Sequence, residues 1–183
     1  MASAFRRTFC TLRPGTPVIE IRDERPADVA AIRELTTRAF GQEEEARIID
    51  RLRSNGAAML SLVAAREDRV LGHIMYSPVL VGGVSGAGLG PMAVVPEHQR
   101  QGIGTRLVEQ GNRRLQETGC PFIVVVGHPR FYPRFGFVPA STHGISCEWN
   151  VPDDVFMVLM LDRMRMRSVS GLARYRPEFK ELS

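Results

Sequence analysis

The sequence predicts a mixed α/β (α+β) domain, with helices on both faces of a mostly antiparallel sheet of about seven strands. Three observations predict this class. Segments in which apolar and polar residues alternate are interspersed with segments that have apolar residues three and four positions apart. Two successive strand segments are separated only by a short turn, as in an antiparallel hairpin. One helical segment lies between two apolar strand segments, as in a crossover connection.

The first part of the domain predicts one strand and two helices. Residues 18–24 (VIEIRDE) alternate apolar and polar, and Pro26 can occupy the first turn of the helix that follows. Apolar residues then recur at helical spacing from Val29 to Ala39. A second segment with apolar residues at helical spacing predicts a helix from about Glu43 to Arg53, which ends at the turn sequence SNG.

The middle of the chain predicts a hairpin, a strand and a helix. Residues 59–66 and 70–81 form the hairpin, joined by the turn EDR. Residues 81–88 (VGGVSGAG) are rich in glycine and predict a loop. A strand over 89–95 follows, and then a helix from about Arg100 to Glu117.

The last part predicts a central strand and the strand that closes the sheet. Residues 121–127 (PFIVVVG) are continuously apolar, as in a strand covered on both faces. The segment 128–135 (HPRFYPRF) predicts a turn or short helix that leads into 136–140. Residues 141–154 predict a long, mobile loop, and 155–161 the closing strand.

Size and composition predict one domain over residues 18–183. With 44% hydrophobic and 24% charged residues, the chain resembles neither a disordered nor a membrane protein. Residues 1–17 contain arginine and no acid, which resembles an organellar transit peptide; we favour a flexible extension. The basic segment from about 163 predicts a second solvated tail, so we expect no nucleic-acid and no membrane partner.

The cysteines predict a reducing compartment. Cys10, Cys120 and Cys147 are odd in number, widely separated and without the spacing of metal ligands. We therefore predict a cytoplasmic protein without disulfides and without a bound metal.

Two features around residue 100 predict a ligand with a diphosphate. Pro91 cannot donate to a sheet and predicts a bulge or splay, which leaves main-chain groups free for a ligand alongside the strand. Gly102 and Gly104 stand at a helix start, although glycine costs about 1 kcal/mol inside a helix. We expect them to let amides approach a bulky anion there.

This stretch resembles the acetyl-CoA motif of the GNAT superfamily of N-acetyltransferases. The pattern V-x-P-x-x-Q-R-x-G-x-G is carried by Val94, Pro96, Gln99, Arg100, Gly102 and Gly104. The segment FYPRFGF is similar to the family's Y-x-x-x-G-F, and both segments together resemble the bacterial YhbS-like group. A dinucleotide fingerprint fails because its third glycine position is Leu107, while helix-cap glycines without a ligand remain the alternative.

The resemblance implies acetyl-CoA as co-substrate. Its pantetheine arm would pair with the backbone of Met92, Ala93 and Val94. Its pyrophosphate would lie on the helix start, which comprises Arg100, Gln101, Gly102, Ile103, Gly104 and Thr105.

The resemblance also implies catalytic roles. Tyr132 matches the family's general acid, since a neutral phenol can donate to the leaving sulfur; packing against Phe137 is the alternative. The family's glutamate is missing from Ile123–Val126, which makes His128 the candidate general base. A purely structural His-Pro turn and a water relay stay open.

Four other candidates for a functional role are better explained by structural roles. We interpret His73 as a satisfied core histidine. The acids Glu43–Glu45 fit a helix start by dipole alone, with an electrostatic role toward a cationic acceptor as the second interpretation. Cys147 and Trp149 fit loop anchoring better than acceptor contact.

Together these features predict an acetyl-CoA-dependent N-acetyltransferase that acts on a small-molecule or protein amine by direct attack in a ternary complex. The alternative is an acyl-CoA-binding or sensing module with little or no transfer activity. The sequence does not identify the acceptor, and a homodimer stays open.

Overall fold

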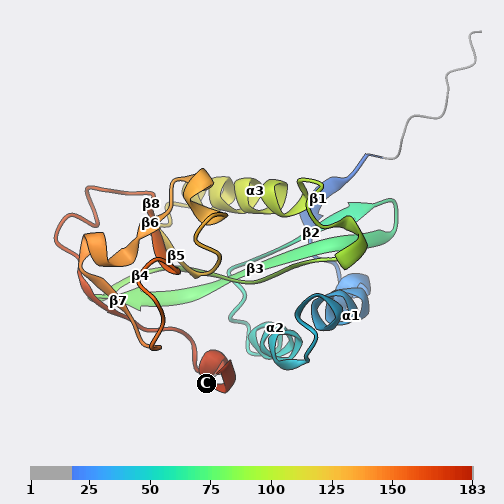
Figure 1. Ribbon diagram of the computed structural model, residues 1–183, viewed down its shortest axis with the longest axis horizontal. Helices are drawn as coiled ribbons and strands as arrows, with labels where there is room; N and C mark the ends of the chain where they lie inside the picture. Colours follow the sequence, from blue (N-terminus) through green and yellow to red (C-terminus); the bar gives the residue numbers. More distant parts are fainter. Residues whose placement is uncertain (1–17, 183) are drawn as a thin grey trace, which may run out of the picture.

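The protein is built on a seven-stranded sheet of order β1-β2-β3-β4-β5-β8-β6, covered on both faces by helices (Figure 1). The computed structural model describes residues 18–182, so the predicted extension 1–17 lies outside the described residues. Neighbouring strands are antiparallel except for β4 and β5. The predicted fold class is confirmed. The sheet strands are β1 (Glu20–Asp23), β2 (Leu60–Arg66), β3 (Arg69–Val81), β4 (Val84–Val94), β5 (Phe122–Val126), β6 (Val138–Pro139) and β8 (Phe156–Met160).

The helices α1 (Val29–Phe40) and α2 (Glu44–Ser54) pack on one face, and α3 (Ile103–Glu117) packs on the other. Side chains alternate between the faces of a strand, so Leu62 packs in the α3 layer and Val63 in the layer of α1 and α2. Both layers are well buried, which fixes the position of each helix end relative to the sheet.

The central strands β4 and β5 pair over a short stretch and then separate. Their parallel pairing comprises Ala87 with Ile123 and Gly88 with Val124. On the β3 side, the register of β4 shifts around Gly90 and Pro91, which are joined by a cis peptide bond. The bulge and splay predicted from Pro91 are therefore present, and the residues of β4 that follow Pro91 lie beside the opening between β4 and β5.

The predicted loop over 81–88 is wrong, because β4 already begins at Val84. Glycine fits this strand for steric reasons. A Cβ at Gly86 would lie 2.6 Å from the Phe122 ring, and one at Gly88 would lie 2.7 Å from Val79. Neighbouring side chains occupy the space that a side chain here would need.

The helix predicted from Arg100 begins only at Ile103. Arg100 has a φ of 59° and Gly102, the N-cap, a φ of 83°, so both lie in the left-handed region and cannot continue a right-handed helix. The glycine pair thus straddles the helix start, with Gly102 before it and Gly104 in its first turn.

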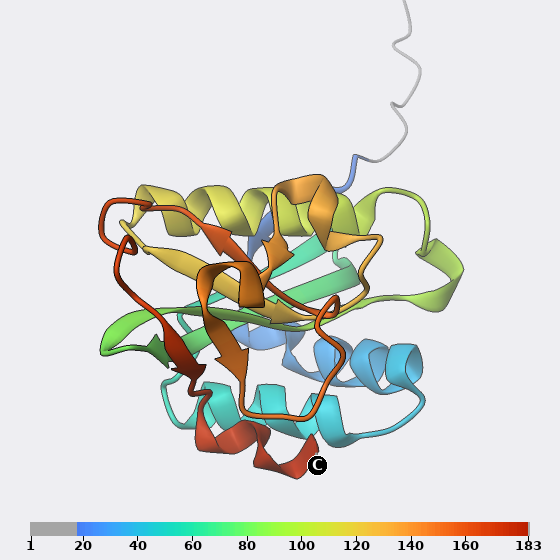
Figure 2. The ribbon, with the colours of Figure 1, turned by 60° about the vertical axis from the view of Figure 1, so that its left-hand side comes forward.

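The predicted mobile loop and solvated tail are both wrong, because the two segments pack together. Within 141–154, β7 (Ile145–Cys147) pairs in parallel with β9 (Gly171–Ala173) in a second, two-stranded sheet. The helical turn η5 (Pro177–Leu182) follows, with Phe179 buried. Figure 2 shows η5 beside α2. The strand over 155–161 does not close the sheet, since β6 pairs on its outer side.

Candidate functional site

A pocket of about 1600 Å³ is formed where β4 and β5 separate. Its floor includes Gly90, Pro91 and Met92 from β4, together with Val126 and Gly127 at the end of β5. The other lining residues come from β4, from the end of α1 to the start of α2, the approach to α3, the segment after β5, the segment after β7 and the C-terminal segment. They are Phe40, Gln42, Glu45, Leu89, Gln99, Arg100, His128, Arg130, Phe131, Tyr132, Arg134, Glu148, Trp149, Asn150, Val151, Tyr175 and Phe179.

The exposed edge of β4 offers main-chain groups on alternate residues. The Val95 amide donates to the Leu71 carbonyl on β3 at 2.9 Å. Because main-chain groups alternate along a strand, Ala93 also faces β3, whereas Met92 and Val94 face away from it. The Val94 carbonyl accepts a hydrogen bond from Gln99 Nε2 at 3.1 Å. Only two of the three predicted backbone partners are therefore directed toward the splay.

The start of α3 lies next to this edge. Its first intrahelical bond runs from the Arg106 amide to the Gly102 carbonyl at 3.1 Å, so the amides just before it have no helical acceptor. A Cβ at Gly102 would meet nothing within 4 Å, and one at Gly104 would lie 3.7 Å from Phe131. No neighbouring atom of the protein excludes a side chain at these two positions.

The predicted cofactor residues divide into two groups. Met92 and Arg100 line the pocket. Gln101, Gly102, Gly104 and Thr105 are exposed or half-buried at the adjoining helix start, while Ile103 points its buried side chain into the core. Any contact of Ile103 with a ligand is therefore limited to its backbone.

Tyr132 lines the pocket and is also firmly packed. Its side chain is 6% exposed, and its ring contacts Phe131 and Phe137 edge-on, with centroids 5.0 and 5.6 Å away. A Cβ at Gly127 would lie 2.2 Å from Tyr132 Cε2, so the glycine makes room for the ring. Burial raises the pKa of Tyr132 above its ordinary value, which keeps the phenol protonated at neutral pH.

His128 is an exposed residue of the pocket lining, directly after β5. Its Nδ1 accepts a hydrogen bond from the Arg130 amide at 3.3 Å, and its carbonyl accepts one from the Phe131 amide at 2.9 Å. The His-Pro turn that the sequence left open is therefore present. With Nδ1 as acceptor, the neutral ring carries its proton on Nε2, which is a donor in this arrangement.

Several lining residues had no predicted role. Arg130 and Arg134 join Arg100 to make one part of the lining basic, and the Arg134 guanidinium stacks over Phe131 at 4.7 Å. The two arginines of the segment HPRFYPRF could have indicated this basic lining from the sequence alone. No sequence feature pointed to Tyr175 and Phe179 as lining residues, because only the fold brings the C-terminal segment to the pocket.

Glu45 and Trp149, which were predicted to be structural, also line this pocket, whereas Cys147 does not. Glu45 is 8% exposed and accepts hydrogen bonds from Gln42 Nε2 at 3.1 and 3.3 Å. Trp149 anchors its loop as expected, because its ring packs against Tyr175. Anchoring and pocket lining therefore coincide in this residue.

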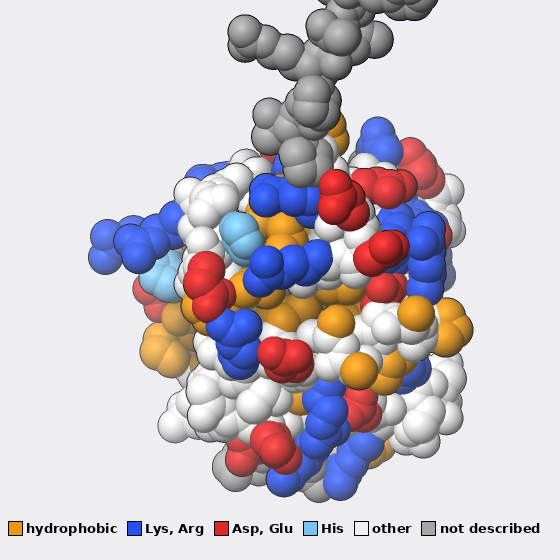
Figure 3. Space-filling view, turned by 90° about the vertical axis from the view of Figure 1, so that its right-hand side faces the viewer, with side chains coloured by type: hydrophobic (Ala, Val, Ile, Leu, Met, Phe, Trp, Pro, Cys, Tyr) orange, Lys and Arg blue, Asp and Glu red, His pale blue; other side chains and the backbone are white. Residues whose placement is uncertain are grey.

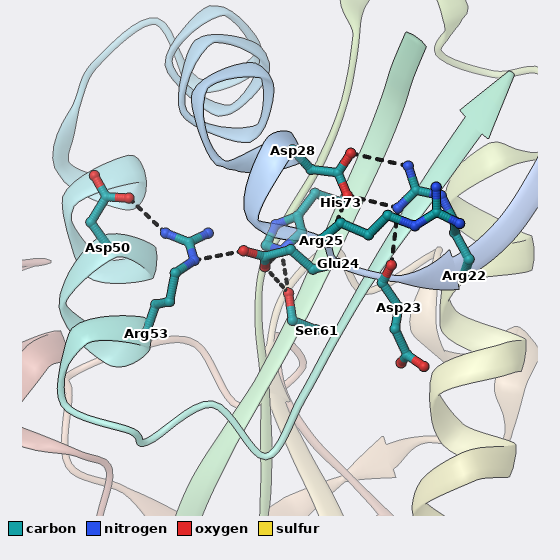
Figure 4. A network of polar contacts seen from close by, with 9 residues as sticks. All are labelled: Arg22, Asp23, Glu24, Arg25, Asp28, Asp50, Arg53, Ser61 and His73. Atoms are coloured by element: carbon teal, nitrogen blue, oxygen red, sulfur yellow. Dashed lines mark hydrogen bonds and ion pairs between the residues drawn. The ribbon is translucent and has the colours of Figure 1, made fainter. Parts of the chain in front are cut away.

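A second polar cluster lies away from the pocket, between β1, β2, β3 and α2 (Figure 4). Fully buried His73 places Nε2 2.8 Å from Ser61 Oγ and 3.5 Å from Glu24 Oε2. Its Nδ1 has no hydrogen-bond partner among the described residues, so the prediction of a satisfied histidine is only half right. Burial lowers the pKa of His73 and keeps the ring neutral at neutral pH, despite the opposing effect of Glu24.

Among residues 18–182, no group of three or more His, Cys, Asp or Glu side chains could hold a metal ion. No helix of this part of the chain has the length and apolar character needed to cross a membrane. On the face that includes the β2–β3 turn, basic and acidic side chains lie side by side around small apolar areas (Figure 3).

Comparisons with known proteins agree with this geometry. The model of the acetyltransferase (GNAT) family matches residues 29–137. The Escherichia coli K12 protein named uncharacterized N-acetyltransferase YhbS is 35% identical over 162 residues, which cover 87% of this chain and 97% of that protein.

Two solved structures are also similar over most of the chain. One is the crystal structure of E. coli YhbS in complex with CoA, with a TM-score of 0.88 and 33% identity over 94% of this chain and 97% of that one. The other is a GNAT family acetyltransferase from Brucella melitensis in complex with acetyl-CoA. It has a TM-score of 0.76 and 35% identity over 90% of this chain and all of that one.

Proposed function

This chain belongs to the GNAT family of acetyltransferases, and from that premise we propose that it transfers the acetyl group of acetyl-CoA to an amine by direct attack in a ternary complex. The active unit is the single domain 18–183. The acceptor is a small-molecule or protein amine.

The observation that carries this proposal is the opening between β4 and β5, which leads directly to the start of α3. A strand edge with free main-chain groups suits the amide-rich pantetheine arm, and unpaired amides at a helix start suit a diphosphate. The complexes of the YhbS and Brucella relatives with CoA and acetyl-CoA support the same ligand here.

Named residues of this chain would hold the two parts of the ligand. The outward main-chain groups of Met92 and Val94 would pair with the pantetheine arm, with Ala93 holding the strand in place from the β3 side. The amides from Arg100 to Thr105 would bind the pyrophosphate. The guanidinium groups of Arg100 and Arg130 would add positive charge near it.

Acetyl-CoA supplies the acetyl group: the amine nitrogen bonds to the thioester carbon, the carbon–sulfur bond breaks, the sulfur gains a proton and the nitrogen loses one. Tyr132 donates to the sulfur, because its phenol stays protonated at neutral pH. His128 accepts the proton of the amine on a ring nitrogen; for Nε2 to do so, the proton of the neutral ring must lie on Nδ1, which gives up the contact with the Arg130 amide. The packing of Tyr132 by Gly127 and Phe137 holds the donor in one orientation.

A CoA-binding or sensing module without transfer is the alternative, since the carboxylate that many family members carry on β5 is missing. Turnover separates the two. Acetyl-CoA binding is measured by calorimetry, and thiol release is then followed in the same sample against a panel of amines. Acceptor-dependent release supports the enzyme, whereas binding without release for every amine supports the sensor.

Tyr132→Phe tests the catalytic part. We expect kcat to fall at least about tenfold while the Kd for acetyl-CoA changes little, because the phenol acts only as the sulfur leaves. Tyr76→Phe is the matched control: Tyr76 is a buried phenol bonded to Asn112 Oδ1 at 3.1 Å and does not line the pocket. Unchanged turnover in Tyr132→Phe would show that Tyr132 serves packing alone.

A further inference from the structure

Three aromatic rings form one wall of the pocket, and none belongs to the acetyl-CoA motif. Trp149 lies 4.6 Å from Tyr175 and 6.4 Å from Phe179, between ring centroids, and Tyr175 lies 5.5 Å from Phe179. All three line the pocket. The three rings therefore form one aromatic wall, in which the buried Tyr175 Oη has no hydrogen-bond partner among the described residues.

Two carboxylates belong to the same end of the pocket. Glu45 stands in the first turn of α2, is 8% exposed, and has the neutral amide of Gln42 as its hydrogen-bond donor. Glu148 precedes Trp149 and accepts a hydrogen bond from the Tyr175 amide at 2.9 Å. Glu45 bonds to a neutral amide and forms no ion pair within residues 18–182, so a cationic group of the acceptor can supply its charged partner.

The basic residues of the lining come from other segments. Arg100 precedes α3, and Arg130 and Arg134 follow β5, close to the predicted site of the phosphates. The pocket is thus basic where the segments of the cofactor motif line it and acidic and aromatic where α2 and the C-terminal segment do. An acceptor with its own carboxylate or phosphate would face Glu45 and Glu148 and be repelled.

We propose that the acceptor is a compact primary amine with an apolar, aromatic or alkyl body and no acidic group. Its amino group binds beside Glu45 as the ammonium, loses one proton to solvent to become the neutral nucleophile and the second to His128 on transfer, and its apolar body packs against the wall of Trp149, Tyr175 and Phe179. Pairs of aromatic rings add specificity beyond buried area, which favours an arylalkylamine within this class. The inference rests on the proposed function and narrows its acceptor.

Trp149 provides a direct measurement of acceptor binding, because it is the only tryptophan in the sequence. Phenethylamine is titrated into the full-length protein and the fluorescence of Trp149 is recorded, with and without CoA. The matched probe is phenylalanine, which differs by one carboxylate. We expect a saturable change with phenethylamine at concentrations at least about tenfold below those needed for phenylalanine.

Thiol release with acetyl-CoA is measured for both probes, for an aminoglycoside and for a lysine-containing peptide. We expect kcat/KM to be highest for phenethylamine. Glu45→Gln should raise the KM for phenethylamine about tenfold or more, because a hydrogen bond to a charged group is lost. The Kd for acetyl-CoA should not change. The control is Glu43→Gln, an exposed neighbour paired with Arg47 at 3.1 Å, which should change neither constant.

The outcomes separate the two proposals. Absence of acetyl-CoA binding overturns the proposed function, while the fluorescence titration still tests the acceptor end by itself. Acetyl-CoA turnover that is fastest with phenylalanine, the aminoglycoside or the peptide overturns the inference and leaves the proposed function intact. A phenethylamine titration that leaves the fluorescence of Trp149 unchanged also overturns the inference about the acceptor.

Discussion

The buried cluster around Glu24 should make the stability of this protein fall in mild acid. Burial raises the pKa of Glu24, but hydrogen bonds from His73, Arg53 and Ser61 together outweigh it and lower that pKa from 4.5 to about 2. Arg53 Nε donates to Glu24 Oε1 at 2.6 Å, and Arg53 Nη1 donates to Asp50 Oδ1 at 2.8 Å (Figure 4).

The sign of the effect follows from linkage. A carboxyl with a lowered pKa in the folded state stabilises the fold above its ordinary pKa, and this stabilisation is lost as the pH falls from about 4.5 toward 2. At about 1.4 kcal/mol per pH unit, the difference amounts to at most about 3.5 kcal/mol. His73 acts in the same direction: its lowered pKa means that the unfolded chain takes up a proton first as the pH falls below about 6.5.

Glu24→Gln removes the charge and keeps the shape. We expect the free energy of unfolding at pH 7 to fall by about 2–3 kcal/mol, because Arg53 loses its charged partner and an amide NH2 replaces the carboxylate oxygen that accepts from Ser61. The difference from the unmodified protein should shrink as the pH falls toward 3. Urea unfolding followed by the fluorescence of Trp149 measures both quantities.

Glu20→Gln is the control, since Glu20 is an exposed residue of β1 on the same strand segment. It should leave the free energy of unfolding nearly unchanged at every pH. Parallel pH profiles for the unmodified protein and Glu24→Gln would refute the role assigned to this cluster, even if the variant were less stable.

Three glycines yield further predictions. Gly102→Glu should weaken acetyl-CoA binding by about a hundredfold or more through steric and charge repulsion, and retained micromolar binding in calorimetry would contradict the pyrophosphate site. Gly127→Ala places a Cβ 2.2 Å from Tyr132 Cε2 and should lower kcat about tenfold with a smaller change in Kd; an unchanged kcat would mean that the ring position is unimportant. Gly111→Ala places a Cβ 2.3 Å from Tyr76 Oη and should cost about 1–3 kcal/mol in urea unfolding, so an unchanged midpoint would show that Tyr76 can move freely.

The sequence alone could point to the part of the candidate site that we assign to the cofactor, because the information for it is local. Pro91, Gly102 and Gly104 lie within a stretch of the chain that also contains the strand and helix they connect. For Pro91 and Gly102 the conformational demand follows from the residue type itself: proline lacks a donor, and the glycine accepts a positive φ.

The acceptor half could not be predicted because its contacts are long-range. Trp149 meets Tyr175 and Phe179 only after β7 and β9 pair, and Glu45 joins them from the other end of the chain. The strand over Gly86 and Gly88 was missed for the same reason, since Phe122 and Val79, which make glycine necessary there, lie elsewhere in the sequence.

The pairing of β7 with β9 has a consequence for how such enzymes can diverge. The family model matches residues 29–137, and the aromatic wall lies entirely after that range. In the acceptor binding that we propose, mutations beyond residue 137 would therefore change the choice of acceptor and leave the shared motif undisturbed. For engineering, the segment from β7 to η5 is the natural unit to exchange between relatives, since grafting one partner of the β7–β9 pair without the other would leave it unmatched.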